Sequence, residues 1–255
     1  MRVLIASCGH IRDLPRRILL ELWARNLTAV AADIDVLYID STSPVDTAAI
    51  LQPFGFRNQG AIEDDTPIDM SAGGRVHVGF KDTSWWGDPA NPSGRSNEAG
   101  RAVRKGLLTA IENDYSHVFY WESDALLAVD VAKEIAKFDR LGLKVAMPWC
   151  HEYNYPETQF CLYSTSYLKE AEFIDSYDWR HGSAGIDELR REDAHRDDLT
   201  ILPWRGRHNN TGWVTRQNFH EIARVSDGSV RMDWISHCDD FTLYLNFLEV
   251  NGIRP

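Results

Sequence analysis

The first 150 residues combine two hydrophobic periods. Short apolar runs bounded by polar residues predict buried strands, and apolar residues at helical spacing predict helices between them. Because strands and helices alternate, the pattern predicts an α/β fold, with a mostly parallel Rossmann-like sheet covered by helices on both faces. The predicted strands are 2–7, 35–40, 75–80, 117–121 and 144–147, and the predicted helices are 14–26, 98–113 and 131–139.

The pattern is weaker in the rest of the chain. Residues 52–69 are polar and interrupted by glycine and proline, and the stretch 85–97 predicts a mobile loop. The charged run 188–198 indicates a solvated helix face. Beyond residue 150, the predicted strands are 159–164 and 199–203, and the predicted helices are 166–176, 219–224 and 241–251.

Charge and cysteine content exclude several classes of protein. The 255 residues carry a formal net charge of −11, and an acidic chain repels the phosphate backbone of nucleic acids. None of the four cysteines forms a Cys-x-x-Cys pair, which argues against a cysteine zinc site. The sequence has no run of 18 apolar residues and no secretory leader at its start. We therefore expect a cytoplasmic protein without a transmembrane segment.

A strand-end acidic motif is the most informative feature of the sequence. The apolar strand 117–121 is followed at once by Glu122, Ser123 and Asp124. Ligand sites in open α/β sheets lie at the carboxyl ends of the strands, where two acids can face one ligand. Carboxylate oxygens suit Mg²⁺ or Mn²⁺ and leave coordination positions for phosphate oxygens. The alternative is a helix N-cap formed by Ser123 or Asp124.

The run YWESDALL at 120–127 resembles the FLDSDD segment of the GT-A family of glycosyltransferases. The resemblance implies a GT-A-like sheet, a divalent metal ion and a nucleotide-diphosphate sugar as the donor substrate. It implies that Asp124 is the main metal ligand. Glu122, which stands where the family has Asp, is the second metal ligand by the same resemblance, and Glu122 and Ser123 are expected to lie at the nucleotide.

The N-terminal runs are similar to the same family. RVLIASCGH at 2–10 resembles its first strand, which places Ser7 among the nucleotide-binding candidates. DVLYIDSTS at 35–43 resembles its second strand, and Asp40 holds the position of the acid that binds the nucleobase. The helix before the metal motif does not match the family's Ala-Arg-Asn triplet cleanly. Its basic residues Arg101, Arg104 and Lys105 are the candidates for contact with the diphosphate.

The C-terminal part resembles the acceptor half of the family. A glycine-led strand runs into a short helix at 211–222, and an acidic pair opens an amphipathic helix within 237–252. By this resemblance Asp240, with Asp239 beside it, is the general base of an inverting enzyme, because a carboxylate can take the proton of the attacking sugar hydroxyl. Acids in a first helical turn are also favourable with the helix dipole alone.

Two of these assignments, the histidine that binds the metal ion and the general base, have alternatives in the sequence. In some relatives a C-terminal histidine completes the metal site, and imidazole suits Mn²⁺. His237 is the predicted ligand here, with His208 and His151 as alternatives. The GIDE turn at 185–188 also echoes a family turn, so Asp187 or Glu188 is the alternative base.

The prediction is a single GT-A-like domain over 1–255, with a nucleotide-sugar-binding half at 1–150 and an acceptor-side half with a smaller sheet at 151–255. Its predicted function is metal-dependent transfer of a sugar to a hydroxyl of a glycan or small molecule. A sugar nucleotidyltransferase is one alternative, although its glycine-rich phosphate loop is missing from the first strand. A binding module without catalysis is the other. No Gly-x-Gly-x-x-Gly follows the first strand, which disfavours a dehydrogenase.

Overall fold

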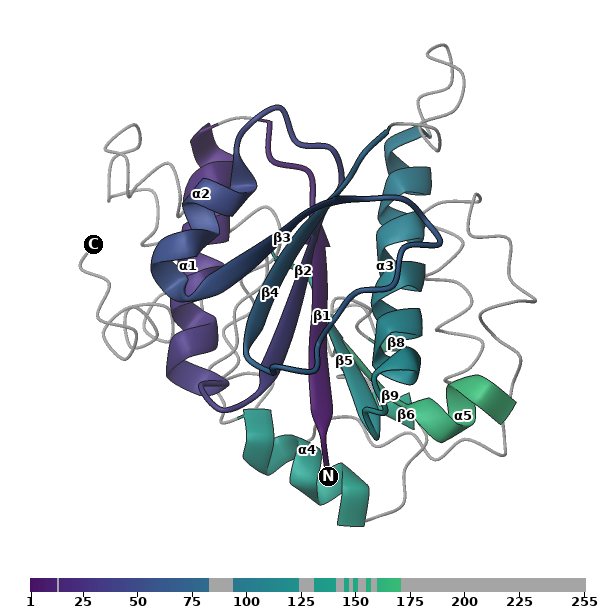
Figure 1. Ribbon diagram of the computed structural model, residues 1–255. Coiled ribbons are helices and arrows are strands. Elements are labelled where there is room, and N and C mark those ends of the chain that lie inside the picture. Colours follow the sequence, from purple (N-terminus) through teal and green to yellow (C-terminus); the bar gives the residue numbers. More distant parts are fainter. Residues whose placement is uncertain are drawn as a thin grey trace, which may run out of the picture.

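The structure, a computed structural model, describes the N-terminal two thirds of the chain with gaps. A mostly parallel sheet of seven strands runs through its centre in the order β3-β4-β2-β1-β5-β9-β6 (Figure 1). The described residues are 1–12, 14–82, 94–123, 131–140, 145–146, 149–150, 155–156 and 160–170.

Five neighbouring strands pair in parallel, and β9 runs antiparallel to both of its neighbours, β5 and β6. A second sheet pairs β7 with β8. The strands are β1 (Val3–Gly9), β2 (Asp35–Asp40), β3 (Phe56–Ile62), β4 (Arg75–Phe80), β5 (His117–Trp121), β6 (Val145–Ala146), β7 (Trp149–Cys150), β8 (Tyr155–Pro156) and β9 (Phe160–Ser164).

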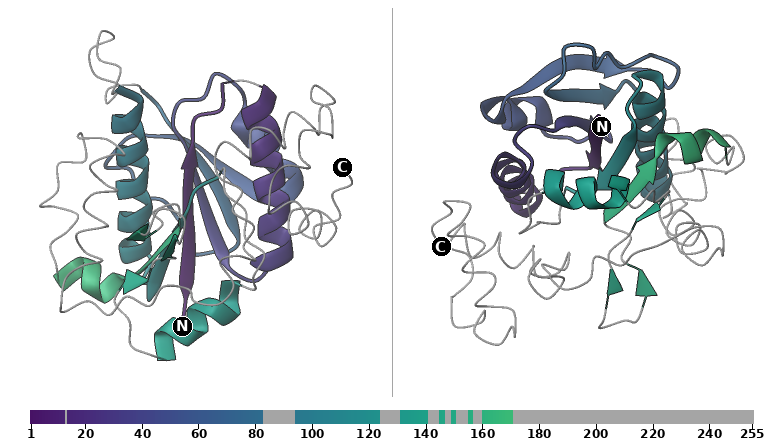
Figure 2. Two further views of the ribbon diagram at one scale, coloured as in Figure 1. Left: turned by 180° about the vertical axis from the view of Figure 1, so that it is seen from behind. Right: turned by 90° about the horizontal axis from the view of Figure 1, so that it is seen from below.

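Helices cover both faces of the large sheet, as Figure 2 shows from behind and from below. One face packs against α1, α2 and α4, and the other packs against α3 and α5. No helix among the described residues is long and apolar enough to cross a membrane. The helices are α1 (Leu14–Val30), α2 (Thr47–Leu51), the 3-10 turn η1 (Gln52–Phe54), α3 (Gly94–Glu112), α4 (Val131–Arg140) and α5 (Thr165–Glu170).

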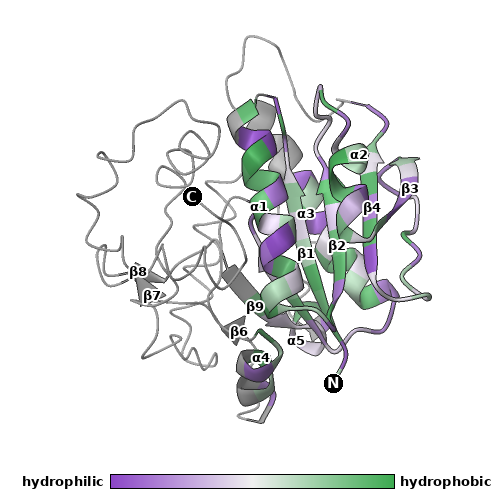
Figure 3. Cartoon of the chain, turned by 90° about the vertical axis from the view of Figure 1, so that its left-hand side faces the viewer, coloured by the Kyte–Doolittle hydropathy of each residue, from purple (hydrophilic) through white to green (hydrophobic). Residues whose placement is uncertain are grey.

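Two hydrophobic cores follow from the alternation of side chains along the strands. Ile5 and Tyr38 pack with Trp23 of α1 on one face, and Leu4 and Leu107 pack on the α3 face. All five are at most 1 % exposed. Figure 3 shows hydrophobic colouring along the central strands and polar bands on α1. Each fully buried aliphatic or aromatic side chain contributes about 1.5–3 kcal/mol, so these cores are the main source of stability.

The predicted architecture is confirmed, with corrections at the borders of elements. The mostly parallel sheet is present, and strand 75–80 has the predicted bounds. Helix α1 continues to Val30, beyond the predicted end at 26. Helix α3 begins at Gly94, so the predicted loop 85–97 is wrong for its last four residues.

Strand β3 was not predicted, because of its position at the edge of the sheet. Only its end residues Phe56 and Ile62 are buried, so the sequence shows no apolar run there. A register shift between Asn58 and Ala61 adds one residue relative to β4, and Gly60 has a φ of 84° at this bulge. The bulge sends Phe56 and Ile62 to the cores on opposite faces of the sheet.

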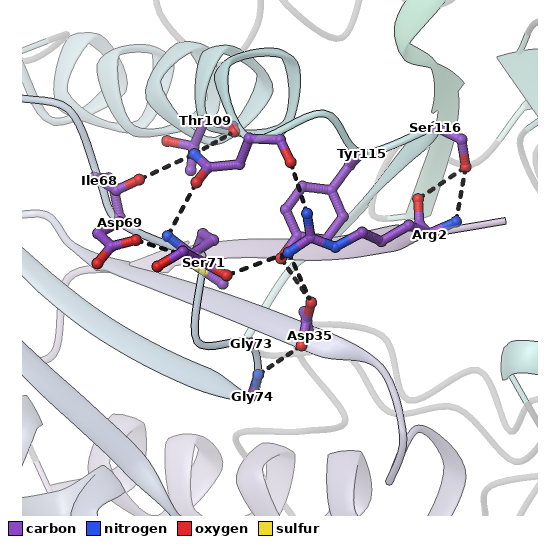
Figure 4. Close-up of polar contacts among 12 residues, drawn as sticks. Arg2, Asp35, Ile68, Asp69, Ser71, Gly73, Gly74, Thr109, Tyr115 and Ser116 are labelled. Carbon is purple, nitrogen blue, oxygen red and sulfur yellow. Dashed lines mark hydrogen bonds and ion pairs between the residues drawn. The ribbon is translucent and has the colours of Figure 1, made fainter.

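A group of polar contacts closes the amino-terminal edge of the sheet (Figure 4). The Arg2 guanidinium stacks 4.1 Å from the centroid of the Tyr115 ring and lies 3.7 Å from a carboxylate oxygen of Asp35. The Tyr115 hydroxyl donates to the same oxygen at 2.7 Å. The other Asp35 oxygen accepts from the Gly74 N–H at 2.5 Å. These contacts tie the starts of β1, β2, β4 and β5 together.

Candidate functional site

The carboxyl ends of β2, β1 and β5 lie side by side and are bonded to one another. The Ser41 N–H donates to the Gly9 carbonyl at 2.9 Å, and the Ser123 hydroxyl donates to the Cys8 carbonyl at 3.0 Å. Position 9 has no room for a side chain, because a Cβ there would lie 2.5 Å from the Tyr38 hydroxyl and 2.9 Å from the Ser123 Oγ. The sequence thus brings three strand ends into one close-packed platform.

Asp40, the last residue of β2, is held by the turn that follows it. Its carboxylate accepts the Ser43 N–H at 3.2 and 3.3 Å and the Ser43 hydroxyl proton. The Ser43 Oγ in turn accepts the N–H of Ile11, at 2.7 Å, from the segment after β1. Thr42 adopts a left-handed φ of 58° to close the turn. The carboxylate is therefore fixed at the junction of two strand ends.

The pKa of the Asp40 carboxyl is raised above its ordinary value. Burial raises its pKa from 3.8 to about 6, although hydrogen bonds from Ser43 and Thr47 lower the pKa and offset part of that rise. The negative charge of Asp46 adds a smaller upward shift in the same pKa. Asp40 therefore takes a proton within the mildly acidic range instead of remaining a carboxylate.

A buried polar chain lies behind Asp40, and the sequence analysis missed it. The Thr47 hydroxyl, one of the groups that lower the pKa of Asp40, lies 2.8 Å from Nε2 of His77 on β4. His77 Nδ1 lies 3.2 Å from the Asn58 Oδ1 of β3, and burial lowers the pKa of His77 to about 4. The available signal was a histidine in the otherwise apolar run 75–80, RVHVGF.

Two serine hydroxyls at these strand ends are buried without a partner. Ser7 on β1 is 1 % exposed and Ser41 after β2 is 4 % exposed, and neither Oγ has a hydrogen-bond partner in the structure as described. Buried hydroxyls normally have partners, so each of these two marks a position where a water molecule or a ligand group is expected. Ser7, predicted at the nucleotide, lies directly beside Tyr38 of β2 in the strand register.

Arg101 is buried on α3 and already bonded. Its Nε pairs with Asp64, its Nη2 lies 3.1 Å from the Asp82 carboxylate and its Nη1 donates to the Asp82 carbonyl at 3.2 Å. The guanidinium also lies 3.8 Å from the centroid of the Phe80 ring. These contacts join α3 to the segments that follow β3 and β4.

The neighbouring basic residues on α3 differ from Arg101. Lys105 is buried, and its ammonium donates to the Asp64 carbonyl at 2.9 Å. Burial lowers the pKa of Lys105. Arg104 is half-buried and makes no hydrogen bond or ion pair with the residues that the structure describes. Among Arg101, Arg104 and Lys105, Arg104 is therefore the candidate whose charged group is not already bonded to another described residue.

The acidic motif is described only in part. Glu122 is half-buried directly after β5, and Ser123 is 8 % exposed on top of β1. Within the described ranges, no group of three or more His, Cys, Asp or Glu side chains is arranged to hold a metal ion. The other predicted site residues lie outside the described residues: Asp124, His151, Asp187, Glu188, His208, His237, Asp239 and Asp240.

No family model matches the chain, and no curated protein matches it in sequence. Residues 1–349 of S. aureus TarS, solved in complex with UDP, are similar in structure. They share 13 % identity at a TM-score of 0.50 over 94 % of this chain and 80 % of that one.

Two further structures are less similar to this chain. A Desulfovibrio desulfuricans G20 protein, named as a nucleotide-diphospho-sugar transferase, is 10 % identical with a TM-score of 0.46, over 99 % of this chain and 98 % of that one. A cytidylyltransferase from Leptospira borgpetersenii is 10 % identical with a TM-score of 0.49, over 91 % and 96 %. Taken with the mostly parallel sheet and its flanking helices, the likeness to TarS shows that this chain has a Rossmann-like α/β fold of the GT-A type.

Proposed function

We propose that this protein is a divalent-metal-dependent glycosyltransferase that moves a sugar from a nucleotide-diphosphate sugar to a hydroxyl acceptor. The observation that carries the proposal is the Asp40 carboxylate, fixed at the end of β2 in a GT-A-like fold. A carboxylate offers about four acceptor positions, and the N–H and hydroxyl of Ser43 occupy part of them. A remaining position suits an N–H of the nucleobase.

The diphosphate and the metal ion belong, in this proposal, at the end of β5. Glu122 and Asp124 supply carboxylate oxygens there, and His237 supplies a nitrogen ligand. A bound Mn²⁺ or Mg²⁺ neutralises the charge that develops on the leaving diphosphate. Arg104 is a better candidate for the diphosphate than Arg101, because the guanidinium of Arg101 is already bonded to two acids.

The acceptor is activated by a carboxylate base. Asp240 takes the proton of the attacking hydroxyl, which makes the hydroxyl oxygen a better nucleophile as the bond to the anomeric carbon forms. Asp239 lies beside it in the sequence. Reaction with a base on the acceptor side inverts the configuration at the anomeric carbon.

A donor screen tests the proposal. Purified protein is incubated with UDP-, GDP- and CDP-sugars, with and without Mn²⁺, and nucleoside diphosphate release is measured. We expect metal-dependent release from one donor class. Release of pyrophosphate from a nucleoside triphosphate and a sugar phosphate identifies a nucleotidyltransferase instead. Binding of a donor without any release identifies a binding module.

The role of Asp40 has its own test. Asp40→Asn keeps the size of the side chain but removes the negative acceptor, so the free nucleotide and the sugar nucleotide are both expected to bind about tenfold more weakly or worse. Asp46→Asn is the matched control, because asparagine also caps α2 through the Ala49 N–H. An effect on the sugar nucleotide alone excludes a base contact.

A further inference from the structure

Ser43 connects Asp40 to the loop that follows β1. The Ser43 hydroxyl accepts the N–H of Ile11 at 2.7 Å and donates its own proton to Oδ1 of Asp40. A backbone N–H can only donate and a hydroxyl has one proton, so the direction of both bonds is fixed. The Ser43 N–H is a second donor, 3.3 Å from Oδ1 and 3.2 Å from Oδ2 of the same carboxylate. One serine therefore links the backbone of one loop to the acid at the end of β2.

Two further hydrogen bonds hold the loops after β1 and β2 together. The Ser41 N–H donates to the Gly9 carbonyl at 2.9 Å. Nδ1 of His10 lies 2.9 Å from the Ser41 carbonyl, and because a carbonyl only accepts, Nδ1 carries the ring proton. This second bond orients a half-buried imidazole ring. Residues 9–11 and 41–43 therefore form one bonded unit at the ends of the two strands.

The bonds from Ile11 to Ser43 and from Ser43 to Asp40 point in the same direction. In such a chain each hydrogen bond polarises the next, so a strong acceptor at the end strengthens the bonds before it. A ligand N–H that bonds the carboxylate uses part of its acceptor strength. The bond from Ser43 then weakens, and the bond from Ile11 weakens with it. The loop after β1 is thereby sensitive to what Asp40 binds.

We propose that Ser43 is a positioning residue with two roles. It holds Asp40 in the orientation that binds the nucleobase, and it transmits the state of Asp40 to the loop at residues 9–11. The inference rests on the proposed function for the identity of the ligand, whereas the link between Asp40 and Ile11 can be measured without a ligand. Ser43 acts through Asp40 and has no contact of its own with the nucleotide in this proposal.

The amide proton of Ile11 tests the link in the absence of nucleotide. The NMR signal of an amide proton moves upfield when its hydrogen bond weakens. Asp40→Asn replaces the carboxylate by a weaker acceptor, so we expect the Ile11 proton to move upfield in this variant. In a Ser43→Ala background the chain is interrupted, and the same Asp40→Asn change is expected to leave the Ile11 proton in place. Equal shifts in both backgrounds, or no shift in either, overturn the link.

Affinity for UDP, GDP and CDP in the presence of Mn²⁺ tests the positioning role. Ser43→Ala removes a hydrogen bond to the Asp40 carboxylate, and we expect the nucleotide that the native protein prefers to bind about tenfold more weakly or worse. Ser43→Thr keeps the hydroxyl and is expected to retain the native affinity within about threefold.

Ser116→Ala is the matched control, at the amino-terminal edge of the sheet (Figure 4). The Ser116 hydroxyl also accepts a backbone N–H, from Arg2 at 3.1 Å, and it donates to the Arg2 carbonyl at 2.8 Å. Its loss is therefore expected to lower stability in urea and to leave nucleotide affinity unchanged.

The outcomes separate a positioning role from a structural one, and this inference from the proposed function. If Ser43→Ala binds the nucleotide as the native protein does, or if Ser116→Ala weakens binding equally, Ser43 is not a positioning residue and the proposed function stands. If none of the three nucleotides binds the native protein, the positioning role falls together with the proposed function, and the Ile11 signal still decides the link.

Discussion

Gly106 of α3 lies directly against Ala6 of β1. A Cβ placed on Gly106 would come within 2.9 Å of the Ala6 Cβ, closer than two such atoms approach in real proteins. Helix α3 therefore sits on the strand at backbone distance. Arg101 and Arg104 lie on the same helix. The contact between Gly106 and Ala6 therefore also fixes the distance of these two arginines from the sheet.

Gly106→Ala is expected to destabilise the fold by about 1–2 kcal/mol. Overpacking costs about 1–3 kcal/mol, and the better helix propensity of alanine returns up to about 1 kcal/mol. Urea unfolding measures the change. Adding Ala6→Gly removes the clashing methyl group, so the double variant is expected to be more stable than the sum of the single changes predicts. Strict additivity contradicts the contact.

Substitutions of Arg101 and Arg104 on α3 are expected to have different effects. Arg101→Ala removes a stack on Phe80 and bonds to Asp64 and Asp82, and we expect a loss of about 1–3 kcal/mol in unfolding free energy. Arg104→Ala is expected to change stability by less than about 0.5 kcal/mol and to weaken binding of the sugar nucleotide. Thermal unfolding and donor titration on both variants check this. Normal donor affinity in Arg104→Ala removes its assigned role.

Asp40 and His77 are expected to give opposite dependences of stability on pH. The folded pKa of Asp40, about 6, lies above its ordinary 3.8, so ionisation opposes folding and stability falls as pH rises from about 4 to 6. The folded pKa of His77, about 4, lies below its ordinary 6.5, so stability rises with pH from about 4 to 6.5. The two slopes, each at most about 1.4 kcal/mol per pH unit, largely cancel in the native protein.

Single variants separate the two slopes. Relative to the native protein, Asp40→Asn is expected to gain stability as pH rises from 4.5 to 6, and His77→Gln is expected to lose it. Urea unfolding at three pH values in this range gives the comparison. Parallel curves for the native protein and both variants contradict the assigned shifts.

The base is tested at Asp240. Asp240→Asn is expected to keep donor binding and to reduce transfer roughly 100-fold or more, because an amide cannot take a proton. Asp239→Asn is expected to do less, since neighbouring helix positions point about 100° apart. Steady-state transfer and donor titration separate the two steps. An active Asp240→Asn with a dead Asp187→Asn or Glu188→Gln moves the base to the GIDE turn, and activity in all of them favours a retaining mechanism.

The sequence predicted the strands that lie inside the sheet, because their side chains are buried on both faces of the sheet. β4 and β5 lie inside the sheet and read as apolar runs, so their bounds were predictable. β3 lies at an edge with five of its seven residues not buried, and no periodic signal marks it. Proline and glycine in 85–97 predicted a loop, but α3 begins at Gly94.

The sequence predicted a residue of the candidate site where the residue and the apolar strand that positions it lie in one short segment. Asp40 follows an apolar strand directly, and strand ends are where ligands bind. The contact between Thr47 and His77 behind Asp40 was not predictable, because these two residues come from separate elements 30 residues apart. Only the strand order, which places β4 beside β2, brings them together.

The bulge at Gly60 lies on β3, the outermost strand on its side of the sheet. β3 ends the strand order on its side, and an outermost strand offers unpaired N–H and C=O groups to any other extended chain. The extra residue interrupts that row of groups between Asn58 and Ala61, and the exposed charge of Arg57 lies just before it. A second molecule therefore finds no regular ladder to extend. The irregularity that hid β3 in the sequence is also a feature that makes this strand a poor template for pairing with another chain.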